Sequence, residues 1–373
     1  MIPDPLVTEL RALGRVRERE PLSRHTTVGI GGPADLYVKV ESVEGLVRVL
    51  SATRRHAVPW FILGAGSNLL VGDGGIRGVV VEYDAKAVHG PEPGAEGTAR
   101  FTIEAGASFA VVARHLARRG YAGLEWGAGI PGTLGGAVAT NAGAYGGSLS
   151  DVLVSVRVCT SGEQPRDLPA SLFKLAYRES VFTLGLLTDV AILSVTVDLT
   201  PDDPAAILAR IEQMEADRKA SQPQGQNTGS VFKNPPGHAA WRLIDAAGLR
   251  GHRIGGAQIT EKHCNFFANT GDATAADFKA LMDLAQARVR DRFGVELEPE
   301  VWLVGEGFSA ALTPVPSPVA TGEGGSRPLS DHQPDPRSVE PSPRPEAQGP
   351  SSAPLSRGHR RGDGSERTRG EGR

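Results

Sequence analysis

Glycine is concentrated in two stretches that each follow a short apolar segment, and this pattern limits the possible folds more than any other feature. The first stretch, residues 63–70, reads Leu-Gly-Ala-Gly-Ser-Asn-Leu-Leu, and the second covers residues 126–147. Glycine allows the backbone to approach a ligand closely, but it weakens a strand or a packed core. We therefore predict two loops whose backbone amides surround an extended ligand. A tight structural turn is the alternative for the first stretch taken alone.

Neither loop has the spacing of the common nucleotide-binding motifs. The third glycine of a dinucleotide-binding fingerprint would fall at position 69, which is leucine. No Lys-Ser or Lys-Thr pair follows to complete a P-loop. The predicted phosphate-binding loops therefore belong to another kind of fold.

Composition is ordinary for a globular protein, and it excludes some classes of partner. Apolar residues make up 40%, charged residues 22%, and the formal net charge is −3, so no nucleic acid or anionic membrane is expected as partner. The two cysteines, Cys159 and Cys264, lack metal-ligand spacing and are expected to be reduced and buried. No signal peptide or membrane span is visible. We expect a cytoplasmic protein without a metal or an obligatory protein partner.

The chain divides into a folded body and a tail. Beyond residue 305 there is no Lys, Ile, Asn, Tyr, Trp or Met, and Pro, Ser, Gly and Arg dominate, which predicts a disordered tail over residues 307–373. In the body, strands and helices mix without a strict alternation, which favours an α+β fold. Strands are expected at residues 35–40, 61–63, 79–82, 101–105, 152–159, 191–199, near 266–268 and at 301–304. Helices are expected at residues 44–56, 108–119, 204–221, 240–247 and 274–293.

Several segments of the sequence together resemble a known family of flavoenzymes. The segment His25-Thr26-Thr27-Val28-Gly29-Ile30-Gly31-Gly32 and the two glycine loops are similar to the FAD-binding region of the UDP-N-acetylenolpyruvoylglucosamine reductases. The resemblance covers roughly residues 20–305 in the right order. Further matching segments are Tyr-Arg-Glu-Ser at 177–180, Gly-Ser-Val-Phe-Lys-Asn-Pro at 229–235, Arg-Ile-Gly-Gly-Ala-Gln at 253–258, Lys-His-Cys-Asn-Phe at 262–266 and Glu-Pro-Glu-Val at 298–301.

The resemblance implies a domain plan and a reaction. After a lead-in over residues 1–20, it implies a two-part FAD-binding domain of the vanillyl-alcohol-oxidase-like (PCMH-type) superfold at 21–200, with parts at about 21–86 and 87–200. A C-terminal α+β substrate-binding domain at 201–306 follows. The implied reaction, in peptidoglycan precursor synthesis, is NADPH-dependent reduction of UDP-N-acetylglucosamine enolpyruvate to UDP-N-acetylmuramate through non-covalent FAD. The short connection at 181–189 resembles the variety of the family that lacks a tyrosine-bearing lid.

The resemblance assigns the chemistry to Arg178, Ser230 and Glu300. A flavin supplies the hydride because no side chain can. Arg178 would hold the substrate carboxylate, Glu300 would donate a hydrogen bond to the developing enol if it stays protonated, and Ser230 would protonate the neighbouring carbon. Taken singly, these residues have ordinary alternatives as a surface ion pair, a strand cap and a turn residue. Their joint occurrence in order favours catalysis.

The same resemblance implies two further sets of contacts. The residues expected to contact FAD are Gly31, Gly64, Ala65, Gly66, Ser67, Asn68, Leu69, Gly129, Ile130, Pro131, Gly132, Thr133, Gly135, Gly136, Ala137, Asn141 and Gly143. The residues expected to contact the UDP-sugar are Tyr145, Lys233, Asn234, Gln258, His263 and Asn265. For His263, a polar core position is an equal alternative.

Two other functions fit parts of the pattern. A flavin oxidase of the same superfold would attach FAD covalently, and His25 is the one candidate near a glycine loop. A catalytically silent nucleotide-sugar-binding protein would use the same scaffold, but it would not need Arg178, Ser230 and Glu300 together.

Overall fold

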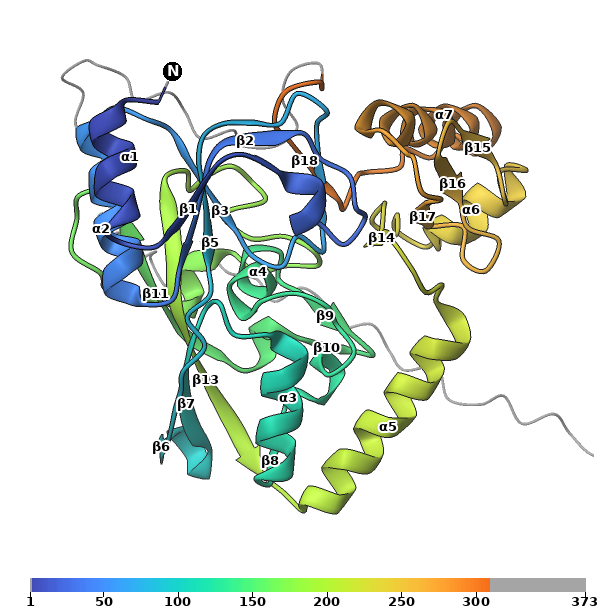
Figure 1. Cartoon of the computed structure of the whole chain (residues 1–373). Coiled ribbons are helices and arrows are strands. Elements are labelled where there is room, and N and C mark those ends of the chain that lie inside the picture. Colours follow the sequence, from blue (N-terminus) through green and yellow to red (C-terminus); the bar gives the residue numbers. More distant parts are fainter. Residues whose placement is uncertain (1, 309–373) are drawn as a thin grey trace, which may run out of the picture. The chain divides into compact units, whose positions relative to one another are not determined.

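The computed structural model describes residues 2–308, and the expected α+β fold class is confirmed (Figure 1). The predicted tail at 307–373 lies outside the described residues, apart from Gly307 and Phe308. In this part of the chain no helix is long and apolar enough to cross a membrane. Cys159 and Cys264 are both free and buried, as expected.

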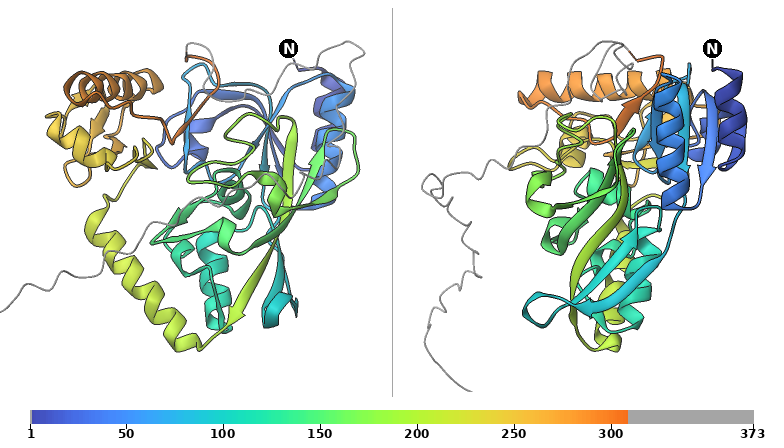
Figure 2. Two further views of the ribbon diagram at one scale, coloured as in Figure 1. Left: turned by 180° about the vertical axis from the view of Figure 1, so that it is seen from behind. Right: turned by 90° about the vertical axis from the view of Figure 1, so that its left-hand side faces the viewer.

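The N-terminal part forms a four-stranded sheet of order β1-β2-β5-β3, covered by two helices that lie side by side (Figures 1 and 2). Its elements are α1 (Asp4–Arg11), β1 (Arg15–Pro21), β2 (Pro33–Val40), α2 (Val43–Arg55), β3 (Trp60–Leu63) and β5 (Ile76–Tyr83). The α2 helix begins where the Ser42 side chain accepts a hydrogen bond from the amide of Gly45, and it buries Leu46, Val49 and Leu50 on one face.

The segment predicted as a lead-in contains regular structure, namely helix α1 and strand β1. Strand β1 pairs with β2 in antiparallel register from Arg15 to Pro21, and α1 buries Leu6 and Leu10. The alternation of charged residues in Arg-Val-Arg-Glu-Arg-Glu-Pro hid this strand, because β1 is an edge strand that exposes most of its side chains.

A second, antiparallel sheet has the order β12-β11-β13-β7-β6, and β8 also pairs with β13. Its strands are β6 (Val88–Pro93), β7 (Ala99–Glu104), β8 (Tyr121–Ala122), β11 (Leu153–Thr160), β12 (Arg166–Pro169) and β13 (Val190–Pro201). Helices α3 (Phe109–Arg118) and α5 (Pro204–Ser221) pack against each other. Ile207 and Ile211 of α5 are buried in the core of this N-terminal part, so α5 packs with the residues that precede it.

Five short elements that were not predicted from the sequence lie within or next to the second glycine stretch. They are η3 (Glu125–Gly127), α4 (Leu134–Ala139), β9 (Gly143–Ala144), β10 (Gly147–Ser148) and η4 (Leu149–Asp151). The Thr133 side chain caps α4 by accepting a hydrogen bond from the amide of Gly136. The loop therefore leads directly into a helix N-terminus.

The C-terminal part has its own sheet, of order β14-β17-β16-β15, and its own apolar core. Its elements are β14 (Asn227–Ser230), α6 (Ala240–Ala246), β15 (Arg253–Ile254), β16 (Ala257–Ile259), β17 (Phe266–Asn269) and α7 (Ala275–Phe293). A reciprocal capping box between Thr274 and Asp277 starts α7. Val28, Ile30 and Leu70 of the N-terminal part join this core.

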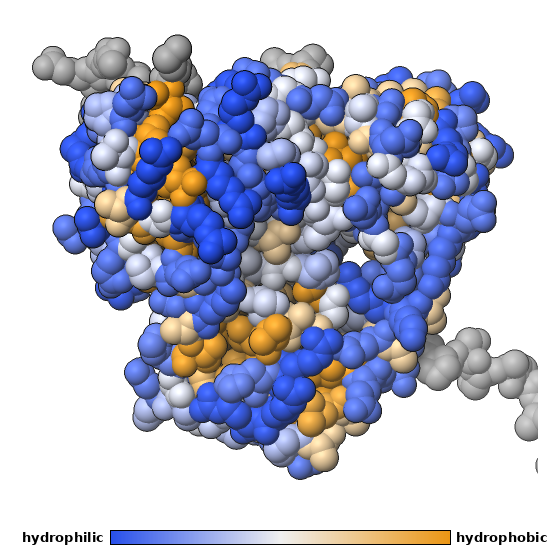
Figure 3. Space-filling model, viewed as in Figure 1, coloured by the Kyte–Doolittle hydropathy of each residue, from blue (hydrophilic) through white to orange (hydrophobic). Residues whose placement is uncertain are grey.

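The final strand returns to the first glycine loop. Strand β18 (Trp302–Val304) pairs in parallel with β4 (Leu69–Val71), so the residues just before β18 lie beside the end of that loop. On the face drawn in Figure 3 hydrophilic side chains predominate and hydrophobic ones form limited patches. The β18–β4 pairing places Glu300 next to the predicted cofactor loop.

Candidate active site

Arg178 and Glu300 form an ion pair between the two parts of the fold. The Nε of Arg178 donates a hydrogen bond to Oε1 of Glu300 at 2.7 Å, and a terminal nitrogen donates to the carbonyl oxygen of Gly143 at 2.6 Å. The two side chains are 22% and 18% exposed, so the pair is accessible to a small ligand but partly shielded from water. Arg178 has a left-handed backbone, φ 55°, within a turn closed by Ala176 and Glu179. The turn aims the guanidinium at Glu300.

The backbone on either side of Glu300 is fixed by two different segments. Its amide donates to the carbonyl oxygen of Val231 at 2.8 Å, and its carbonyl oxygen accepts a hydrogen bond from Nδ2 of Asn68 at 3.0 Å. Burial raises the pKa of Glu300 above its ordinary value, although Arg178 and Lys233 act in the opposite direction. The Glu300 carboxyl therefore takes up a proton at higher pH than an exposed glutamate does, and in that protonated form it can act as a hydrogen-bond donor.

Ser230 ends strand β14, directly before the residue that binds the Glu300 amide. Its backbone is opposite Phe266 in the β14–β17 pairing, and the side chain is half-buried. Among residues 2–308, the Ser230 hydroxyl has no hydrogen-bond partner.

A cavity of about 110 Å³ opens at the Arg178–Glu300 pair. Arg178, Lys233 and Glu300 all line it, which brings together three residues that the sequence placed in separate motifs. The remaining lining residues are Thr140, Thr183, Glu298, Pro299, Val301, Trp302 and Leu303. The cavity combines a guanidinium, an ammonium and a carboxyl group, as a carboxylate-bearing substrate would require.

Lys233 and Asn234 follow Ser230 in the chain, and their side chains have different partners. The Lys233 ammonium contacts Glu298 at 2.6 Å and Glu179 at 3.6 Å, and its side chain is 14% exposed. Oδ1 of Asn234 accepts a hydrogen bond from the Ala240 amide at the start of α6. Lys233 therefore lies at the cavity, whereas the Asn234 side chain already supports a helix.

The other predicted substrate contacts have different environments. Both side-chain atoms of Asn265 bind the backbone of Phe232, at 3.0 and 2.8 Å, so Asn265 supports the Ser-Val-Phe-Lys-Asn loop. Gln258 donates to the carbonyl oxygen of Gly251. The exposed Tyr145 has a left-handed backbone, φ 52°, and its hydroxyl donates to Met214 on α5. None of these three lines the described cavity.

His263 is surrounded like a core residue. Its ring lies 5.8 Å from that of Trp241 and 4.9 Å from that of Phe266. Burial lowers the pKa of His263, and its Nδ1 is buried without a partner in the described chain. This environment favours the core alternative over a substrate contact.

The two glycine loops meet each other, as a shared ligand would require. A Cβ at Gly64 would lie 2.7 Å from Oγ1 of Thr133, and the Ser67 hydroxyl donates to the carbonyl oxygen of Pro131 at 3.0 Å. Gly66, with φ 62°, lies against the backbone of His25, where a Cβ would be only 2.1 Å from the carbonyl oxygen. Protein atoms fill the space that a Cβ would need at both positions, which explains why Gly64 and Gly66 carry no side chain.

A larger, mainly apolar cavity of about 190 Å³ borders the same loops. Gly64, Thr133, Gly135 and Gly136 line one side of it, and Val190–Ile192 of β13 line another. Glycine amides next to an apolar cavity fit a cofactor that carries both a diphosphate and aromatic rings. The residues present thus fit FAD. Within residues 2–308 no cluster of His, Cys, Asp or Glu could hold a metal.

Several predicted cofactor residues have structural contacts of their own. Asn141 is 3% exposed, its Nδ2 donates to Ala176 and its Oδ1 accepts from Ser150. Gly143 receives the Arg178 hydrogen bond, and Ala137 is buried in α4. Asn141 thus fixes the turn that carries Arg178.

Several polar residues at or near the site were not among the predicted site residues. Thr140, Thr183 and Glu298 line the smaller cavity. Arg218 on α5 has its Cδ 3.0 Å from the position of a Cβ on Gly129, burial lowers the pKa of Arg218, and no carboxylate among residues 2–308 pairs with it. Only Glu298 had a sequence signal, because it precedes Glu300 in the Glu-Pro-Glu motif.

Comparison with known proteins identifies the family. The family model described as "FAD binding domain" matches residues 34–165, and that of "UDP-N-acetylenolpyruvoylglucosamine reductase, C-terminal domain" matches residues 221–304. The reductase of Lachnoclostridium phytofermentans is 42% identical over 293 residues, covering 78% of this chain and 94% of the relative. That of Chloroflexus aurantiacus is 42% identical over 287 residues, covering 76% and 96%.

A solved structure agrees with these matches. The crystal structure of UDP-N-acetylenolpyruvylglucosamine reductase from Thermus caldophilus has 34% sequence identity and a TM-score of 0.65, and the match covers 78% of this chain and 99% of that one. The C-terminal family match begins at residue 221, where α5 ends. The chain belongs to the UDP-N-acetylenolpyruvoylglucosamine reductase family of FAD-binding enzymes.

Proposed function

We propose that this protein reduces the enolpyruvyl group of UDP-N-acetylglucosamine enolpyruvate to give UDP-N-acetylmuramate, with NADPH as the hydride donor. The observation that carries the proposal is the Arg178–Glu300 pair in a cavity next to the end of β14 and the first glycine loop. When bound, FAD supplies the hydride chemistry that side chains lack. The glycine loops at 64–68 and 129–136 would hold it.

Arg178 would hold the substrate carboxylate beside the reacting alkene. Its guanidinium is oriented by Glu300 and Gly143, so little reorganisation is needed when a carboxylate arrives. Glu300, with its raised pKa, would donate a hydrogen bond to the same group as negative charge develops on it. The guanidinium of Arg178 and the protonated carboxyl of Glu300 would thus both stabilise the negative charge that develops on the substrate carboxylate.

Ser230 would protonate the alkene carbon next to the carboxylate. Its position follows from the backbone, because Val231 binds the Glu300 amide and Ser230 precedes it. A hydroxyl is a weak acid, and the neighbouring cavity is lined by two cations, Lys233 and Arg178, whose positive charge would favour loss of the proton. Lys233 would also attract the diphosphate of the UDP-sugar.

The proposed reaction needs only small diffusible substrates. NADPH and UDP-sugars are both metabolites of the bacterial cytoplasm, so we propose a cytoplasmic location. Neither nucleic acid, a membrane nor a protein partner takes part in the proposed chemistry.

The proposal is tested by product analysis. The full chain is incubated with FAD, NADPH and UDP-N-acetylglucosamine enolpyruvate, and the sugar nucleotide is examined by mass spectrometry. We expect the substrate mass to increase by two hydrogen atoms, with one NADPH oxidised for each product formed. Oxidation of NADPH without that mass change would contradict the proposal, as would retention of unchanged substrate with FAD bound.

A further inference from the structure

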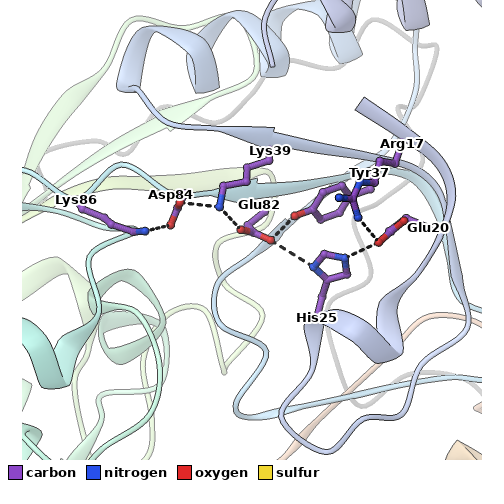
Figure 4. A network of polar contacts seen from close by, with 8 residues as sticks. All are labelled: Arg17, Glu20, His25, Tyr37, Lys39, Glu82, Asp84 and Lys86. Carbon is purple, nitrogen blue, oxygen red and sulfur yellow. Dashed lines mark hydrogen bonds and ion pairs between the residues drawn. The ribbon is translucent and has the colours of Figure 1, made fainter. Parts of the chain in front are cut away.

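Eight side chains form a continuous polar network on the first sheet, next to the first glycine loop (Figure 4). They come from β1, η1 (Leu22–His25), β2, β5 and the turn that follows β5. The members are Arg17, Glu20, His25, Tyr37, Lys39, Glu82, Asp84 and Lys86. None of them belongs to the cavity at Arg178 and Glu300.

His25 lies at the centre of this network, between two carboxylates. Its Nε2 is 3.0 Å from Oε1 of Glu20, and its Nδ1 is 3.4 Å from Oε2 of Glu82. The ring lies 4.4 Å from that of Tyr37, and the His25 side chain is 15% exposed. The contact of Nε2 with Glu20 is within hydrogen-bond distance, and the contact of Nδ1 with Glu82 is the longer of the two. Two opposed contacts and a ring neighbour fix the imidazole in one orientation.

The two carboxylates are in turn held by other groups. Arg17 contacts Glu20 at 2.8 Å, Lys39 contacts Glu82 at 3.0 Å, and the Tyr37 hydroxyl donates to Glu82. Burial opposes ionisation of Glu20 and Glu82, but hydrogen bonds from His25 and Arg17 keep the pKa of Glu20 below its ordinary value. Hydrogen bonds from Tyr37 and Lys39 do the same for the pKa of Glu82. His25 therefore faces two ionised, immobilised partners.

The backbone of His25 contacts the first glycine loop directly. Its carbonyl oxygen occupies the space beside Gly66 that a Cβ would need, and the amide of Thr27 donates to the carbonyl oxygen of Gly66 at 3.1 Å. The same loop continues through Ser67, which binds Pro131, and through Asn68, which binds the carbonyl oxygen of Glu300. A displacement of His25 would thus move the contacts of both glycine loops.

We propose that His25 is a positioning residue, whose two carboxylate contacts fix residues 64–68 in the conformation that binds the diphosphate of FAD. His25 touches neither the substrate cavity nor the reacting side chains, so it controls affinity for the cofactor and not the rate of the bound enzyme. The same contacts occupy both ring nitrogens, which leaves no free nitrogen for a covalent bond to FAD. The inference rests on the proposed role of the glycine loop as the FAD diphosphate site.

Two variants and one control test the inference in the full chain. His25→Phe keeps the ring beside Tyr37 but removes both nitrogen contacts, and Glu20→Gln keeps the shape of the partner but removes its charge. Lys86→Met is the control, because Lys86 lies in the same network and, among residues 2–308, its ammonium pairs with Asp84 alone. FAD is titrated into each apoprotein by the quenching of flavin fluorescence. NADPH-dependent turnover is then measured at saturating FAD.

We expect His25→Phe to raise the Kd for FAD by on the order of tenfold, the effect of losing a hydrogen bond to a charged group. Glu20→Gln should raise it less, Lys86→Met should match the wild type, and kcat at saturating FAD should stay within about twofold for all three. The inference is overturned if folded His25→Phe and Glu20→Gln both bind FAD like the wild type. It is also overturned if Lys86→Met weakens FAD binding equally.

Circular dichroism of the apoproteins shows whether each variant is folded, and Glu20→Gln decides the question if His25→Phe is not. The wild type separates this inference from the proposed function. If the wild type binds FAD and forms product, the proposed function stands whatever the variants do. If the wild type binds no FAD, the proposed function fails first, and the inference fails with it.

Discussion

Nε of Arg178 lies 2.7 Å from Oε1 of Glu300, although 122 residues separate them in the chain. The pair joins a turn of the N-terminal part to the segment that precedes β18, and the β18–β4 pairing holds that segment against the first glycine loop. The guanidinium of Arg178, the carboxyl of Glu300 and the first glycine loop are thereby brought to one place. The predictions below each test one part of this arrangement.

Replacing Ser230 by alanine should nearly stop the second half of the reaction. The backbone pairing of β14 with β17 remains, so FAD binding and flavin reduction by NADPH should be unchanged. Reoxidation by the enolpyruvyl sugar should slow by about 10²- to 10⁴-fold, which is typical for loss of a positioned proton donor. Stopped-flow absorbance of the two half-reactions measures this. Ser221→Ala, at the exposed end of α5, is the matched control. Wild-type reoxidation in Ser230→Ala would show that another group donates the proton.

The pH dependence of reoxidation should report the carboxyl of Glu300. Because burial raises the pKa of Glu300, the protonated donor is present below that pKa and is lost as the pH rises through it. Single-turnover reoxidation should therefore slow with rising pH, starting above the ordinary pKa of 4.5. Glu300→Gln, which keeps a hydrogen-bond donor that does not ionise, should remove this limb of the profile. If the reoxidation rate of Glu300→Gln fell with rising pH in the same way, the pH dependence would belong to a different group.

The same raised pKa makes a prediction for stability. The folded state binds the Glu300 proton more tightly than the unfolded state does, so ionisation of Glu300 in the folded protein costs stability. This cost is absent below the unfolded pKa and grows until the pH exceeds the folded pKa. Thermal unfolding followed across that range should show a smaller loss of Tm with rising pH for Glu300→Gln than for the wild type. Parallel pH profiles would contradict the raised pKa.

Lys233 should matter for affinity toward the UDP-sugar. Its side chain is 14% exposed at the cavity, and its ammonium pairs with Glu298 and Glu179. We expect Lys233→Met to raise the KM for the enolpyruvyl sugar by about tenfold or more, since a charge-assisted contact to phosphate is lost. Lys279→Met, which removes an exposed i,i+4 pair on α7, is the control. Steady-state kinetics at saturating NADPH give both values, and an unchanged KM in Lys233→Met would remove Lys233 from the substrate site.

Gly66→Ala should abolish FAD binding without unfolding the protein. The new Cβ would lie 2.1 Å from the carbonyl oxygen of His25, and φ of 62° is already unfavourable for alanine. Gly97→Ala has a similar positive φ of 80° but open space around the Cβ, so it tests backbone strain alone. We expect flavin-free protein for Gly66→Ala and normal flavin content for Gly97→Ala. Equal flavin content in both would mean that the loop does not bind the cofactor.

The regular helices were the part of the fold best predicted from sequence. Residues 44–56 and 274–293 correspond to α2 and α7, because both helices have a capping residue and an apolar stripe of helical period. Strand β1 was missed because an edge strand of arginine and glutamate shows little alternation in hydrophobicity. Helix α4 was missed because it begins inside a run of glycine, where local propensity argues against a helix and tertiary contacts decide.

The candidate site was predicted as a set of motifs, but its geometry was not. The family resemblance named Arg178, Ser230 and Glu300, whereas the ion pair between Arg178 and Glu300 depends on the long-range β18–β4 pairing. Some polar residues inside the motifs form hydrogen bonds that support the backbone, and the spacing of residues in the sequence does not reveal these contacts. Asn265 supports the Phe232 backbone, and Asn141 fixes the turn before Arg178. Side-chain amides such as these are interpreted only once their hydrogen-bond partners are known.

The most direct test of the central claim is an anaerobic absorbance experiment on the full chain reconstituted with FAD. NADPH is added first and UDP-N-acetylglucosamine enolpyruvate second, while the flavin bands are recorded. We predict that NADPH bleaches the bands and that the enolpyruvyl sugar restores them, with one equivalent of sugar consumed. Bleaching that the sugar does not reverse would contradict the reductase function and leave a flavoprotein with another substrate. A protein that cannot be reconstituted with FAD at all would contradict the account of the site itself.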